Sequence, residues 1–183
     1  GAAVLFLSGS HGAEVLPSER PLHPGSAPFD RGRFRQTVRS LGLAETVDLR
    51  NVRPGLEEAW ARQHGSLRAQ VEGLQALPRG ADQQVYDAHT LCRANDHGPL
   101  GVVLRRTGAL LTHFAERFPD MELGDYQVAH RRITDAAIKA QDQAPRRLEL
   151  YYAACALRRQ IALRNPLLDF DRLLFVARGN DTR

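Results

Sequence analysis

Apolar side chains recur every three or four residues along most of the chain, the spacing that places them on one face of an α-helix. Between these stretches lie breaks rich in proline, glycine, asparagine and aspartate, which interrupt regular structure. The pattern predicts a short helix over residues 34–43, which Gly42 ends or interrupts, and longer helices over residues 54–77, 83–94, 100–118, 124–141 and 145–164. Trp60, in the first of the longer helices, reads as a core residue.

The last predicted helix is unusual because its apolar residues cover a wide arc. One face carries Leu148, Tyr151, Tyr152 and Cys155, and another carries Leu150, Ala154, Leu157 and Ile161. A wide apolar arc predicts contact with more than one neighbouring element. Asn165 before Pro166 should end this helix, because the residue before a proline is pushed out of helical geometry.

Beyond that break the sequence changes to an extended pattern. Asp169 and Asp171 alternate with Phe170, and the compact apolar run that follows predicts a short β-strand over residues 173–176. Residues 167–183 therefore read as a junction that leads into a β domain, which lies either further along a longer chain or in a partner.

The N-terminal third begins with a proline-rich arm. Pro17, Pro21, Pro24 and Pro28 lie close together, so we expect an extended arm over residues 1–35 and a helical domain over residues 36–166. Residues 1–12 fit either a signal-peptide remnant or a short buried strand.

Ser10 and Gly12 match part of a nucleophile elbow, the G-x-S-x-G turn that exposes a catalytic serine. Ser8 replaces the first glycine of this motif, and no helix follows it.

The connection 119–123 is short, so the helices on either side of it should form an antiparallel hairpin. The predicted fold class is thus mostly α: helical hairpins or a bundle, with the proline-rich N-terminal arm and a short C-terminal β-strand.

The composition of the chain favours a globular domain over a nucleic-acid-binding or membrane-spanning one. The chain has 183 residues, of which 43% are hydrophobic and 25% charged, as is usual for a globular domain. Its net charge is +4, but the basic residues are nearly all arginines in scattered pairs, with Lys139 as the one lysine. No basic block is interleaved with aromatic residues, so the sequence does not favour nucleic-acid binding. No segment reads as a transmembrane helix.

Metal and redox chemistry have few candidate residues. The two cysteines, Cys92 and Cys155, form no CxxC or CxxCH motif, so they supply neither a haem attachment nor a zinc knuckle on their own. They fit a disulfide in an exported chain or two buried thiols. Asp96 and His97 read mainly as turn residues.

One pair of histidines suggests a metal site. His113 and His130 lie at similar distances from the predicted hairpin turn, so their imidazoles could face each other, with Glu116 or Asp135 as a carboxylate. A packed or hydrogen-bonded histidine pair is the competing interpretation. No catalytic motif is complete, and we assign no catalytic residue.

A family resemblance enters at the C-terminal end. The run ALRRQIALRNPLLDFDRLLFVAR resembles a segment of large multidomain planctomycete proteins related to the hydrazine synthase alpha subunit, and VVLRRTGALLTHF fits the helical region before it. The resemblance spans about residues 80–178, and NPLLDFDRLLFV is its specific part. It implies an exported protein in which a helical segment precedes a β-propeller, although a cytoplasmic location remains open. Because the chain has no CxxCH, haem or metal would come only from partner segments.

Two functional hypotheses follow. The first is a non-catalytic helical scaffold or interaction module that docks a β domain or a partner subunit. The second is a segment of a hydrazine synthase-like haem or metal redox enzyme, an oxidoreductase whose site other segments complete. The first predicts an interface, which would consist of Leu150, Leu157, Ile161, Leu173, Leu174, Phe175 and Val176.

Overall fold

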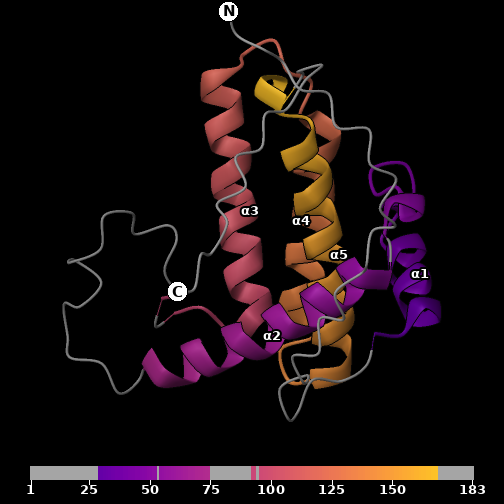
Figure 1. Ribbon diagram of the computed structural model, residues 1–183, viewed down its shortest axis with the longest axis vertical. Coiled ribbons are helices and arrows are strands. Elements are labelled where there is room, and N and C mark those ends of the chain that lie inside the picture. The colour runs from indigo at the N-terminus through magenta and orange to yellow at the C-terminus, as the bar shows by residue number, and fades with distance from the viewer. Residues whose placement is uncertain (1–28, 53, 75–91, 94, 169–183) are drawn as a thin grey trace, which may run out of the picture.

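Helix α5 (Ala144–Leu163) is the element around which the other helices pack in the computed structural model (Figure 1). The structure describes residues 29–52, 54–74, 92–93 and 95–168. Every residue of α5 from 150 to 157 is buried, and Ile161 is buried one turn later. The helix contacts α1 (Arg31–Ser40), α3 (Gly98–Arg117) and α4 (Gly124–Lys139). The predicted contact of this helix with several neighbours is confirmed.

The helices α3, α4 and α5 follow one another as two hairpins. The α3–α4 turn lies at residues 118–123, as the sequence predicted, and a second short turn at residues 140–143 leads into α5. Consequently α3 and α5 run in the same direction and begin at the same end of the molecule (Figure 1). Leu111 and Phe114 of α3 and Ile133 of α4 belong to the buried core with α5.

Helix α2 (Pro54–Leu74) is held to α5 by one buried tyrosine. The hydroxyl of Tyr151 donates to the backbone carbonyl of Trp60 at 3.1 Å and lies 3.3 Å from Oε1 of Gln63. Trp60 and Leu67 are both buried on the same helix. The prediction that Trp60 is a core residue is therefore confirmed.

Helix α1 begins earlier than the sequence predicted. Asp30 is its N-cap and accepts a hydrogen bond from the backbone N–H of Arg33 at 3.0 Å. Phe34 is buried and its ring lies 5.2 Å from that of Phe29, which fixes the first turn against the bundle. Residues 31–33, which lie before the helix predicted at 34–43, are thus helical, and this helix begins three residues earlier than the sequence predicted.

Gly42 ends α1, as its sequence position suggested. Its φ of +63° is the left-handed conformation that favours glycine, and Leu43 N–H donates to the Val38 carbonyl at 2.9 Å to close the end. The guanidinium of Arg132 on α4 bonds the Gly42 carbonyl at 3.0 Å. A short 3-10 helix, η1 (Leu49–Asn51), then leads toward α2.

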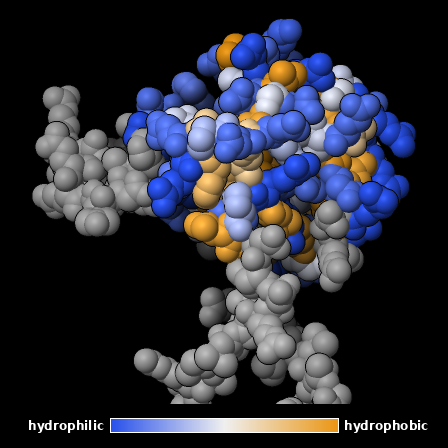
Figure 2. Space-filling view, turned by 90° about the horizontal axis from the view of Figure 1, so that it is seen from above, coloured by the Kyte–Doolittle hydropathy of each residue, from blue (hydrophilic) through white to orange (hydrophobic). Residues whose placement is uncertain are grey.

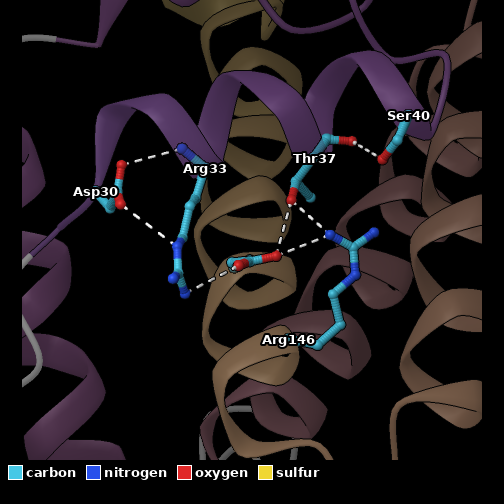
Figure 3. Close-up of polar contacts among 6 residues, drawn as sticks. Asp30, Arg33, Thr37, Ser40 and Arg146 are labelled. Carbon is cyan, nitrogen blue, oxygen red and sulfur yellow. Dashed lines mark hydrogen bonds and ion pairs between the residues drawn. The ribbon is translucent and has the colours of Figure 1, made fainter.

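A polar network fixes α1 to the first turns of α5 (Figure 3). Glu149 Oε2 accepts from Arg146 at 2.8 Å and from the Thr37 hydroxyl at 3.2 Å, and Arg146 also donates to Thr37 at 2.7 Å. Arg33 lies 3.8 Å from the other oxygen of Glu149. Because Thr37 is buried between the helices, these bonds satisfy a hydroxyl that would otherwise be costly to bury.

The fold class predicted from sequence is confirmed at the coarse level. The described residues form five α-helices, are 76% helical and contain no strand. After Asn165, η3 (Pro166–Leu168) forms one turn of 3-10 helix, which confirms the predicted end of α5. The proline-rich arm up to residue 28, most of the helix predicted at 83–94 and the strand predicted at 173–176 lie outside the described residues.

We expect Leu157→Ala to lower the free energy of unfolding by about 2–5 kcal/mol, because it removes a side chain with 0% exposure from the centre of the bundle. Urea denaturation measures this change. Leu163→Ala on the same helix is the control: at 51% exposure it should change stability by less than about 0.5 kcal/mol. Equal losses in the two variants would contradict the central position of α5.

Candidate functional site

The bundle itself buries three of the seven residues of the predicted partner interface. Leu150, Leu157 and Ile161 are each 0% exposed and belong to the core cluster. They contact the helices of this chain, so they offer no surface to a partner in the folded structure. The remaining predicted interface residues, Leu173, Leu174, Phe175 and Val176, lie outside the described residues.

An exposed group of leucines instead occupies the end of α5 and η3. Leu163, Leu167 and Leu168 are 51%, 70% and 47% exposed. They fall within six consecutive positions, whereas the other large hydrophobic residues exposed in the described ranges, Val128 and Ile138, lie apart on α4. We call these three residues the leucine end. Figure 2 views the molecule from this end, where hydrophobic surface lies among hydrophilic residues.

Local hydrogen bonds explain why these leucines face outward. Asn165 Oδ1 accepts from the backbone N–H of Leu167 at 3.0 Å, and the Asn165 carbonyl accepts from Leu168 N–H at 2.9 Å. The asparagine therefore turns the chain away from the axis of α5 just before Pro166. As a result, the apolar residues that follow cannot continue the buried face of the helix.

The leucine end carries positive charge along its own segment. Residues 151–168 contain arginines and no aspartate or glutamate, and Arg159 and Arg164 are exposed. The guanidinium carbon of Arg164 lies 5.6 Å from the centre of the Tyr126 ring, a cation–π contact that holds this arginine beside α4. An apolar surface with fixed cations at its edge is thus available for contact.

His113 and His130 have different surroundings in the part of the chain that is described. His130 Nε2 lies 2.9 Å from the carbonyl oxygen of Leu104, a hydrogen bond that uses this nitrogen. The His113 side chain is exposed, and its ring lies 6.1 Å from that of Phe114 on the same helix. Over the described residues, no group of three or more His, Cys, Asp and Glu side chains could hold a metal ion.

Asp96, a turn candidate from sequence, has a structural partner that sequence reasoning missed. Its carboxylate accepts from Arg105 Nε at 2.8 Å and Nη2 at 2.7 Å, and from the backbone N–H of Arg93 at 2.7 Å. Burial alone would raise the pKa of Asp96, but the bonds from Arg105 and Arg93 outweigh it and lower the pKa. Because Asp96 lies in the turn before α3, helical spacing does not relate it to Arg105, and the sequence carried no local signal for this pair. Neighbouring His97 is exposed.

Both cysteines are buried free thiols in the structure, which favours the second of the two interpretations from sequence. Burial raises the pKa of Cys155 to about 12, so this thiol stays protonated at neutral pH and is a poor nucleophile. Burial also raises the pKa of Cys92, whose sulfur lies 3.5 Å from Oε1 of Gln70. Their environments are those of core residues.

Comparisons with protein-family models, with curated proteins and with solved structures find no match to this chain. The resemblance to hydrazine synthase-like proteins over residues 80–178 therefore stays a prediction, as do export and the haem or metal chemistry of partner segments. Among the described helices, none combines the length and the apolar character needed to cross a membrane.

The Asp96–Arg105 pair yields a prediction for stability. We expect Asp96→Asn to lower the free energy of unfolding at pH 7 by about 3 kcal/mol, because Arg105 loses its carboxylate partner in a largely buried position. Urea denaturation measures the loss, and exposed Asp135→Asn on α4 is the matched control, expected to be near neutral.

The contribution of the Asp96–Arg105 pair to stability depends on pH, and its direction follows from the pKa of Asp96. Since the pKa of Asp96 in the folded state lies below its ordinary value of 3.8, the contribution of this pair is complete above that value. It is lost as the pH falls through the folded-state pKa. The gap between wild type and Asp96→Asn should therefore shrink in acid, and a gap that stayed constant below pH 3.8 would contradict the ion pair.

Proposed function

We propose that this chain is a non-catalytic helical interaction module that binds a protein partner through the leucine end. The observation that carries the proposal is the exposure of Leu163, Leu167 and Leu168 together at one end of the bundle. Scattered exposed apolar residues are ordinary, whereas apolar residues gathered at one place favour a contact site. The middle of α5, residues 150–157, is buried, and the leucine end is one of the two ends at which this helix reaches the surface.

The charges beside the leucines define the partner. Arg159 and Arg164 are exposed on the same segment. A partner that fits would present an apolar centre with aspartate or glutamate at its rim, because complementary charges speed association and fix orientation. This matches the docking of a β domain or partner subunit expected from sequence, but moves the contact from the middle of α5 to its end.

The rigidity of the bundle supports this role. The leucines follow a helix whose residues 150–157 and Ile161 are buried in the bundle, so little conformational freedom is lost when a partner binds. The asparagine-held turn of η3 presents Leu167 and Leu168 in one arrangement. A pre-ordered apolar surface of this kind binds more tightly than the same residues on a free segment.

The test uses Leu167→Glu, which places a charge at the centre of the leucine end. Partners from a lysate of the source cells would be captured by photo-crosslinking, identified by mass spectrometry, produced separately and titrated by calorimetry. We expect Leu167→Glu to weaken binding at least about tenfold, as for an apolar hot-spot residue.

Ile138→Glu is the matched control, because Ile138 on α4 is 68% exposed and Leu167 is 70% exposed. It should bind like wild type, and both variants should keep the wild-type melting temperature. Equal affinity of wild type and Leu167→Glu for the purified partner would overturn the proposal. The proposal would also be overturned if both variants weakened binding equally, because the added negative charge alone would then explain the effect.

A further inference from the structure

A cavity of about 710 Å³ lies at the opposite end of α5 from the leucine end, where α3 and α5 begin. Its volume is within the range of about 300–1,000 Å³ that is typical of small-molecule sites. Helices α1, α2, α3 and α5 all contribute to its wall. Apolar and aromatic side chains form much of the lining, among them Phe34, Val71, Leu100, Leu148 and Tyr152.

Two helix N-termini open on this cavity. Residues 97–100 at the start of α3 and residues 144–149 at the start of α5 line it. Neither helix is capped by a side chain at its N-cap residue, and neither has an acidic residue in its first turn. Gly98 N–H donates to the Asp96 carbonyl at 2.8 Å, and Pro99 and Pro145 have no N–H, so the N–H groups that remain in the two first turns and the positive ends of the two dipoles favour an anion.

The charged side chains of the wall leave one cation without a carboxylate. Asp30 and Glu149 pair with Arg33, and Glu72 pairs with Arg68. Arg147 instead donates to the backbone carbonyls of His97 and of Ala137, the latter at 3.4 Å. Among the described residues, no carboxylate lies within ion-pair distance of its guanidinium.

Two further groups of the wall offer polar contacts. His64 is half-buried, and desolvation together with the charge of Arg68 lowers its pKa, so it presents a neutral imidazole at pH 7. Its ring is fixed edge-on to Tyr151, with centroids 4.8 Å apart. Tyr152 is 3% exposed, and its hydroxyl is buried with no hydrogen-bond partner among the described residues.

We propose that this cavity binds a monoanionic carboxylate ligand with an apolar body. The carboxylate lies near Arg147 and the two helix N-termini, and the body packs against Phe34, Val71 and Leu148. A single negative charge fits because the wall also contains Asp30, Glu72 and Glu149, which repel a multiply charged anion such as a polyphosphate. The site is independent of the leucine end, since α5 has 20 residues and separates the two by about 30 Å.

Calorimetric titration of the full chain with 2-naphthaleneacetate tests the proposal, with 2-naphthaleneacetamide as the uncharged probe of the same shape. We expect one site for the acid and at least about tenfold weaker binding of the amide, because the amide forms no charge-assisted bond. Inorganic phosphate, which has no apolar body, should bind more weakly than the acid.

Arg147→Gln should weaken binding of the acid at least about tenfold and leave the amide unchanged. Exposed Arg131→Gln on α4 is the matched control and should bind like wild type. Val71→Trp, which fills the cavity from α2, should abolish binding of both probes. This second variant tests the site without changing Arg147, in case Arg147→Gln lowers the melting temperature. The proposal would be overturned if the acid did not bind, or if the amide or phosphate bound as tightly as the acid. It would also be overturned if Arg147→Gln or Val71→Trp left the affinity for the acid unchanged.

Discussion

The burial of α5 on every side is the constraint on which the rest of this structure depends. A helix whose residues from 150 to 157 are all buried has no face that can remain in water. It is stable only when neighbours cover it completely, and this requires α1, α2, α3 and α4 together. The polar groups that accompany these contacts are satisfied in place: the Tyr151 hydroxyl by the Trp60 carbonyl, and Glu149 by Arg146 and Thr37. Helices α1 and α2 are thus fixed to α5 by directed bonds as well as by apolar contact.

Because its middle is covered, α5 meets solvent at its two ends, and the two ends differ in chemistry. At the beginning, the parallel arrangement of α3 and α5 brings two uncapped N-termini beside Arg147, His64 and Tyr152 around one cavity. At the end, Asn165 turns the chain and leaves leucines beside arginines. Neither surface is visible as a sequence motif, because each is assembled from residues whose roles depend on where the helices stop and which of them lie side by side.

The sites predicted from sequence show which features the spacing of apolar residues can predict and which it cannot. The apolar spacing of Leu150, Leu157 and Ile161 was read correctly as one face of a helix, but spacing does not say whether a face is covered by the same chain or by a partner. The His113–His130 idea rested on equal distance from a turn. Equal distance does not fix the contacts, because rotation about each helix axis decides where a side chain points, and His130 bonds a backbone carbonyl of α3. The ion pair of Asp96 with Arg105 links a turn to a helix, a relation that simple patterns do not reveal.

By itself, the sequence determined the mostly helical class, the α3–α4 hairpin, the core position of Trp60, the wide apolar arc of α5 and the end of that helix at Asn165-Pro166. These features follow from local rules: the 3.6-residue period, the backbone limits of proline and the conformational freedom of Gly42. Only the tertiary structure decided that α5 is central, that α1 begins at an Asp30 cap, and which apolar residues are buried and which exposed. Those outcomes depend on how segments far apart along the chain pack together. The burial of a residue and its hydrogen-bond partners are fixed only when all the helices are in place.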